Sequence, residues 1–65
     1  MSAELFVLKF NQMVDLDAVF GIIMHIQRPD IDRKLMTLTF TSLVALRDAI
    51  EFAQDNNIQM DMSIA

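Results

Sequence analysis

The sequence predicts an α+β fold, a small two-layer sandwich in which helices pack against one face of a β-sheet. Met36, Leu38 and Phe40 alternate with threonines, which is the spacing of a half-buried strand. Directly afterwards, Leu43 and Ile50 belong to an apolar helical stripe with charged residues opposite. A strand that leads straight into an amphipathic helix buries one side of each, so this stretch defines the inward side of the sheet.

Length and composition predict a single domain over residues 1–65. The chain has no cysteine, one glycine and one proline, and 54% of its residues are hydrophobic. At this size only about 60% of the unfolded chain's surface is buried on folding, and no disulfide supports the fold. A hydrophobic content of 54% is more than one small core can bury, so we expect a homodimer or another interaction face.

Charge and hydropathy argue against two classes of partner. A formal net charge of −4 repels phosphate backbones, so direct nucleic-acid binding is not expected. The uncharged run over residues 18–27, like every other in the sequence, is shorter than the ~20 apolar residues that cross a bilayer, so no membrane partner is expected. The start of the sequence lacks the features of a signal peptide. Together with the absence of cysteine, this indicates a cytoplasmic protein.

The segments near the two ends are predicted to be strands. Residues 4–10 are predicted to form a strand that is mostly apolar on both faces, as in a central strand that is covered on two sides. Residues 58–64 alternate apolar and polar side chains, as in a strand with one buried and one solvent-exposed face. The helix that precedes this last strand begins at Thr41 or Ser42, either of which can cap it. It ends at residues 56–57, because asparagine tolerates the left-handed backbone of a helix end.

The segment 13–28 has three interpretations. A single helix from Asp15 to Arg28 places acids at its start and basic residues at its end, as the helix dipole favours. A single strand over residues 18–28 fits the content of valine, isoleucine and phenylalanine. The third interpretation, which we prefer, divides the segment at Gly21.

In the divided interpretation, a short helix over residues 16–20 is capped by Asp15 and closed by Gly21 in the left-handed conformation. A strand over residues 22–28 follows, and its inward side chains are Ile22, Met24 and Ile26. Residues 28–33, which contain proline and two aspartates, then form the tight turn to the next strand.

The preferred element order is strand, helix, strand, strand, helix, strand, which is the βαββαβ arrangement of ferredoxin-like folds. Its two central strands are residues 5–10 and 35–40. The single-strand interpretation gives βββαβ instead, and the single-helix interpretation gives βαβαβ with a longer first helix.

The junction Phe40–Ile50, FTSLVALRDAI, is similar to the third-strand-to-second-helix junction of RNA-recognition motifs and of ACT-type regulatory domains. The resemblance covers about a sixth of the chain and implies a ferredoxin-like fold. RNA-recognition motifs carry aromatic residues on the outer sheet face, where this chain has Leu35, Thr37 and Thr39. The glycine-bearing loop of ACT-type domains is replaced by residues 11–13. We therefore assign no family.

Few residues are suited to carry chemistry. His25 is the single histidine, and no nucleophile or carboxylate has a recognisable catalytic spacing to it. The aspartate pairs 15/17 and 30/32 do not continue into a calcium-binding loop, and helix capping and turn formation explain them. Met60 and Met62 suit soft metals but share the inward side of a strand. We predict no metal, no cofactor and no enzymatic activity.

The remaining feature is a surface. If even-numbered strand residues face the helices, the odd-numbered residues form the open face of the sheet, where several are large and aliphatic. Such a face is usually polar, so we expect another protein chain to cover it. The predicted interface is Leu5, Val7, Ile23, His25, Leu35, Thr37 and Thr39. The acidic face of the last helix (Asp48, Glu51 and Asp55) is predicted to be solvated or to dock a basic partner protein.

The sequence therefore leads us to expect a non-enzymatic regulatory or protein-interaction module, such as a small inhibitor. It would form a homodimer through the open sheet face. The alternative is a small-molecule-binding regulatory domain of ACT-like architecture, with its ligand near residues 11–17.

Overall fold

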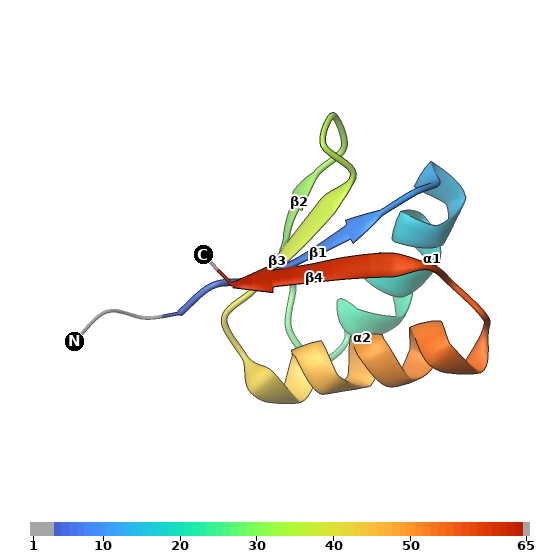
Figure 1. Cartoon of the computed structure of the whole chain (residues 1–65). Coiled ribbons are helices and arrows are strands. Elements are labelled where there is room, and N and C mark those ends of the chain that lie inside the picture. Colours follow the sequence, from blue (N-terminus) through green and yellow to red (C-terminus); the bar gives the residue numbers. More distant parts are fainter. Residues whose placement is uncertain (1–3, 65) are drawn as a thin grey trace.

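The protein is described by a computed structural model that covers residues 4–64 and has the element order βαββαβ (Figure 1). The predicted ferredoxin-like two-layer sandwich is confirmed. The elements are β1 (Phe6–Phe10), α1 (Met13–Ile23), β2 (Asp30–Asp32), β3 (Thr37–Phe40), α2 (Leu43–Asp55) and β4 (Met60–Ile64).

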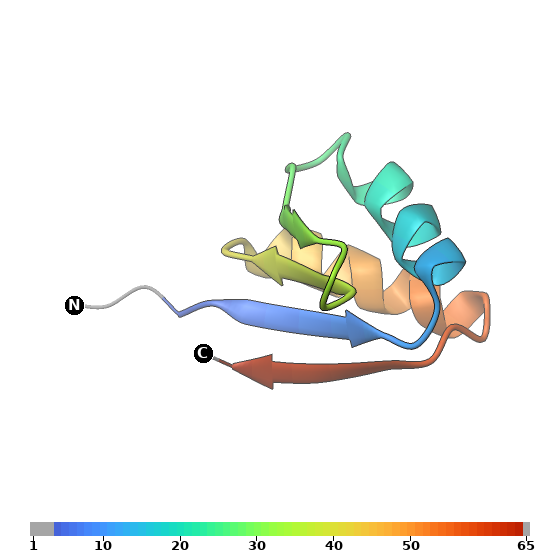
Figure 2. The ribbon, with the colours of Figure 1, turned by 90° about the horizontal axis from the view of Figure 1, so that it is seen from above.

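The four strands form one antiparallel sheet in the order β2-β3-β1-β4. The central strands β1 and β3 lie in the two segments predicted for the centre, although β3 begins at Thr37 rather than at residue 35. Strand β2 forms one edge of the sheet and β4 the other (Figure 2). Each edge strand therefore has one hydrogen-bonding side without a neighbouring strand among residues 4–64.

The core lies between the two central strands and the helices. The even-numbered residues Leu8, Phe10, Leu38 and Phe40 of β1 and β3 are buried, as the alternation predicts, whereas Phe6 is half-buried. Leu8 and Leu38 are paired across the two strands. Both helices contribute side chains to the same cluster. The buried apolar residues are Leu8, Phe10, Leu16, Val19, Ile23, Leu38, Phe40, Ala45, Leu46, Ala49 and Ala53.

Helix α2 begins and ends where its sequence predicts. The Ser42 Oγ accepts a hydrogen bond from the Ala45 N–H at 3.4 Å, so Ser42 is the N-cap. At the other end Asn57 has a φ of 55°, the predicted left-handed conformation. The Ile58 N–H then donates to the Ala53 carbonyl at 2.8 Å, which satisfies an otherwise unpaired carbonyl of the last turn.

The division of segment 13–28 at Gly21 is wrong. Helix α1 runs without a break to Ile23, and the φ of Gly21 is not positive. The buried residues Leu16, Val19 and Ile23 follow helical spacing and outweigh the β-propensity of the segment. Ile22 is consequently on the exposed side of the helix.

The residues after α1 do not form the predicted strand. Met24 and Ile26, expected to face inward, are each 49% exposed and lie in a turn. The second strand is instead Asp30–Asp32, within the segment predicted to be a turn. A three-residue strand with one inward side chain, Ile31, carries too short a pattern to be recognised from its alternation.

The connection between β2 and β3 is a turn over residues 33–36. The Asp32 carboxylate accepts hydrogen bonds from the Lys34 N–H at 3.0 Å and from the Leu35 N–H at 3.1 Å. Asp32 therefore has the turn-forming role predicted for it, but the turn covers residues 33–36 and not the predicted residues 28–33. Met36 closes the turn with a φ of 55°.

Candidate interaction surface

The predicted interface residues do not lie together. Ile23 is fully buried at the end of α1, and His25 is exposed in the turn that follows. Leu35 is 60% exposed in the β2–β3 turn. None of these three belongs to a strand, so the odd-numbered parity that placed them on the open sheet face does not apply. Their assignment to that face is corrected.

Three predicted residues do lie on the open face. Val7, Thr37 and Thr39 are half-buried, and Val7 is paired with Thr39. Leu5 precedes β1 and is 38% exposed. The other open-face residues, given by the strand register, are Lys9, Asp30, Asp32, Asp61 and Ser63. The open face is mostly polar, and the expected cluster of large aliphatic side chains is absent from its strands.

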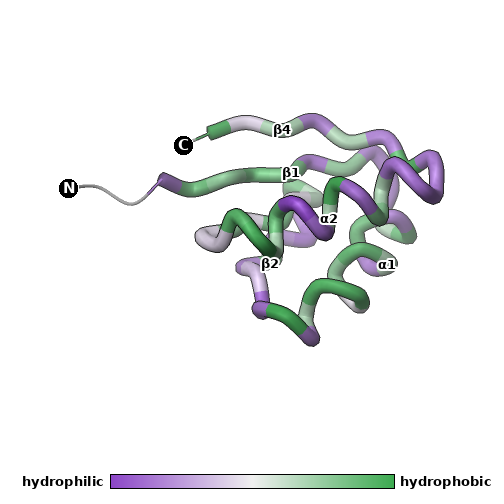
Figure 3. Tube along the Cα trace, turned by 90° about the horizontal axis from the view of Figure 1, so that it is seen from below, coloured by the Kyte–Doolittle hydropathy of each residue, from purple (hydrophilic) through white to green (hydrophobic). Residues whose placement is uncertain are grey.

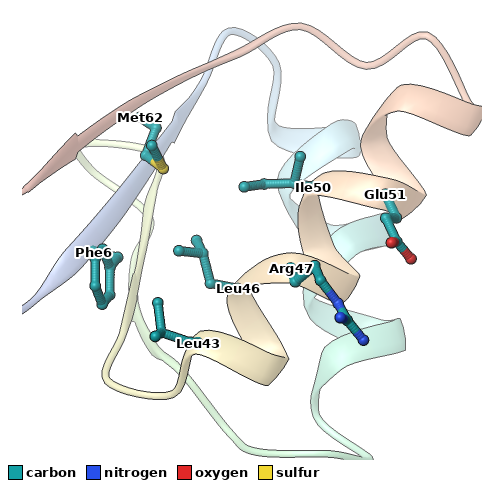
Figure 4. A pocket seen from close by; sticks show the side chains of 7 residues that line it. All are labelled: Phe6, Leu43, Leu46, Arg47, Ile50, Glu51 and Met62. Atoms are coloured by element: carbon teal, nitrogen blue, oxygen red, sulfur yellow. The ribbon is translucent and has the colours of Figure 1, made fainter.

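An apolar concave surface lies between α2 and β4, and we call it the α2–β4 groove. Leu43, Leu46 and Ile50 project from α2 toward Phe6 of β1 and Met62 of β4 (Figure 4). Arg47 and Glu51 complete the lining and point away from these side chains. The groove has a volume of about 430 Å³ and opens to solvent.

The groove exists because α2 packs toward α1 and β3 and leaves the inward side of β4 uncovered. Met62 is 54% exposed and Ile64 is 61% exposed, although both have the parity that the alternation assigns to the core. The predicted core position of Met62 is therefore wrong, whereas Met60 packs against the core. The exposure of β4 could have been expected from the predicted βαββαβ topology, because the last strand of this topology forms an edge of the sheet.

A second apolar surface covers the outer side of α1. Figure 3 shows α1 as hydrophobic along most of its length, whereas α2 alternates hydrophobic and hydrophilic residues. Val14 is 67% exposed and Ile22 is 46% exposed, two turns apart on the same helix.

The acidic residues of α2 are accessible to differing degrees. Glu51 and Asp55 are exposed, and Asp48 is half-buried. Glu51 follows Arg47 by four residues, a spacing that brings opposite charges together on a helix. The face is therefore of mixed charge beside the groove and acidic farther along α2.

The structure shows the positions of two aspartates that the sequence offered as helix caps or metal ligands, Asp15 and Asp17. Asp17 forms an ion pair with Arg33, with 2.6 Å between Oδ1 and Nη1, which connects α1 to the β2–β3 turn. Gln12, and not Asp15, is the N-cap of α1, and its side chain makes no capping bond. Within residues 4–64 there is no group of three or more His, Asp or Glu side chains that could hold a metal ion.

The described part of the chain contains neither a buried polar residue nor a membrane-spanning helix. No polar or charged residue among residues 4–64 is buried. Neither helix there has the length and hydropathy needed to cross a bilayer.

Comparison with protein-family models, with curated proteins and with solved structures finds no match to this chain. The α2–β4 groove is therefore interpreted from its own geometry.

Proposed function

We propose that this protein is a non-enzymatic protein-interaction module that forms a homodimer, and that it does so through the α2–β4 groove. The open sheet face, on which the sequence placed the interface, is too polar for that role. The observation that carries the proposal is the exposure of Met62 and Ile64 beside an apolar groove. Contiguous exposed apolar patches on small proteins mark sites of association.

Two features of the groove support a protein partner. Its apolar lining includes Phe6 and Met62, and phenylalanine and methionine are enriched at the centre of interfaces. Its charged residues, Arg47 and Glu51, lie at its rim, where interfaces are polar. A second copy would also cover apolar surface that a 65-residue chain cannot bury alone.

Sedimentation velocity and light scattering after size-exclusion chromatography, from about 1 µM to about 100 µM, test the proposal because that range spans weak and moderate interfaces. We expect a monomer–dimer equilibrium that shifts to dimer as the concentration rises. A single species of 7.4 kDa across the range would contradict self-association.

A regulatory or inhibitory role in the cytoplasm is part of the same proposal. It is supported by the small size and the net charge of −4, which favours basic partner proteins. The exposed carboxylates of Glu51 and Asp55 would contact such a partner. Binding of this kind weakens as salt is added, which separates it from apolar self-association.

The volume of the groove supports a second candidate function, small-molecule binding. About 430 Å³ lies within the range of ligand pockets, and the lining suits an apolar ligand. The site differs from the one predicted near residues 11–17, since Phe6 is at the opposite end of β1 from Asn11. Thermal-shift measurements with apolar amino acids and fatty acids test this function. A rise in melting temperature that Ile50→Asp abolishes would support it, and no shift with any ligand would contradict it.

A further inference from the structure

We infer that the second copy binds edge to edge along β4, in an antiparallel register centred on Met62, so that the two sheets become one sheet of eight strands. This inference rests on the proposed function, because it names the geometry of the homodimer. It follows from the different character of the two sheet edges and from the sequence of β4.

The β2 edge has several features that prevent strand pairing. It is three residues long, Pro29 precedes it, and its two outward side chains are Asp30 and Asp32. Short length, proline and charge are the means by which edge strands avoid pairing with other chains.

The β4 edge lacks most of these features. It is five residues long, contains no proline, and has one charged residue, Asp61. Its register with β1 is unbroken over all five residues, from Phe6–Ile64 to Phe10–Met60, so no bulge turns the edge away. Of the two edge strands, β4 is therefore the better suited to pair with a strand of another chain.

The identity of that strand follows from the self-complementarity of β4. Two antiparallel copies related by a two-fold axis at Met62 pair all five residues, with Met62 opposite Met62 and Met60 opposite Ile64 of the second copy. Residues directly opposite each other share a face of the sheet. Both copies therefore keep their apolar side chains on the helix side, and their polar side chains on the open face.

The polar side favours the same register. With the axis at Met62, the carboxylate of Asp61 lies opposite the hydroxyl of Ser63 in the second copy, which can donate a hydrogen bond to it. Moving the axis to Asp61 would set two carboxylates opposite each other, which is destabilising. Within its own chain Asp61 is paired with Lys9, an opposite charge.

The surface area that a stable dimer must bury can be supplied by β4 together with the α2–β4 groove. A specific interface buries about 800 Å² per partner, a little over a sixth of the 4517 Å² of exposed surface. A five-residue strand is only ~17 Å long, so groove side chains must contribute as well. Leu43, Met62 and Ile64 are each more than half exposed and lie beside this edge.

Disulfide cross-linking tests the register, and the natural chain contributes no cysteine of its own. Directly opposite residues in an antiparallel pair have Cα atoms ~4.5–5.5 Å apart, within the range for a disulfide. The variants are Met62→Cys, Asp61→Cys and Ser63→Cys, with Ala18→Cys on α1 as the control at an exposed site. Each is oxidised mildly at concentrations where the wild type is dimeric, and circular dichroism confirms that it is folded.

We expect Met62→Cys to form a linked homodimer rapidly. Asp61→Cys and Ser63→Cys should form a linked heterodimer when mixed, faster than either links to itself. Faster linking of Ala18→Cys, or equal rates at all positions, would overturn the edge-to-edge geometry while leaving self-association intact. A wild type that is monomeric at every concentration would overturn the homodimer itself, and this inference with it.

Discussion

Leu8 and Met62 are paired across β1 and β4 and lie on the same side of the sheet, yet Leu8 is fully buried and Met62 is 54% exposed. The boundary of the core therefore runs between two neighbouring strands. Helix α2 covers the central strands and stops short of the edge, so β4 presents an apolar side and an unpaired backbone edge together. The proposed dimer uses both.

Met62→Asp is expected to give a folded monomer. The side chain is outside the core, so the circular dichroism spectrum should be unchanged, while two charges would enter the interface. We expect the dissociation constant to rise by roughly 30-fold or more, equal to about 2 kcal/mol. Sedimentation equilibrium measures the change.

Val14→Asp is the matched control for that variant. Val14 is 67% exposed, similar to Met62, but lies in the first turn of α1, where a carboxylate is tolerated by the helix dipole. Its dissociation constant should equal that of the wild type. The opposite result, a monomer from Val14→Asp and a dimer from Met62→Asp, would move the interface to the outer side of α1.

Salt should strengthen the homodimer. Each copy carries a net charge of −4, so the two copies repel each other while their apolar surfaces attract. Between about 0.01 M and about 1 M NaCl the Debye length falls from ~30 Å to ~3 Å, which removes most of the repulsion. The dissociation constant from sedimentation equilibrium should fall over this range. A rise would indicate that ion pairs, rather than apolar contacts, hold the copies together.

Gly21→Ala is expected to stabilise the fold. Gly21 is a solvent-exposed residue of α1, and a Cβ there would have no neighbour within 4 Å apart from the adjacent residues and the backbone of the helix itself. Alanine is favoured over glycine in a helix by roughly 0.5–1 kcal/mol, so the melting temperature should rise by several degrees. If the helix ended at Gly21 with this residue in the left-handed conformation, alanine would be strained there and Gly21→Ala would lower the melting temperature. A lowered melting temperature would therefore contradict the continuous helix.

Leu38→Ala and Leu35→Ala should differ sharply, although the two residues are three positions apart. Leu38 is fully buried in β3, and its truncation should lower the free energy of unfolding by roughly 2–5 kcal/mol. Leu35 is exposed in the turn, and its truncation should cost less than about 0.5 kcal/mol. Urea denaturation followed by circular dichroism measures both. Equal losses would mean that the β2–β3 turn is misplaced.

The parts of the fold that sequence predicts well are those with a long, single-period pattern. The stretch from β3 through α2 is of this kind, and its cap at Ser42 and its end at Asn57 follow from local chemistry. Helix α1 was harder, because apolar residues such as Val14 and Ile22 also occupy its exposed side. An amphipathic period is weak in such a helix.

The groove could not be predicted in the same way. The alternation in β4 correctly puts Met62 on the helix side, but whether a helix covers it depends on where α2 packs, which is a tertiary property. The open-face prediction is wrong for Ile23, His25 and Leu35, because strand parity does not apply to residues in a helix or in a turn.

Amide hydrogen exchange measured at low and high protein concentration tests the central claim most directly, because it reports which backbone edge gains hydrogen bonds. Our account predicts that amides of residues 60–64 become more protected as the dimer forms, while those of residues 30–32 do not change. A dimer that forms without any added protection in β4, or with new protection along β2 instead, would contradict it.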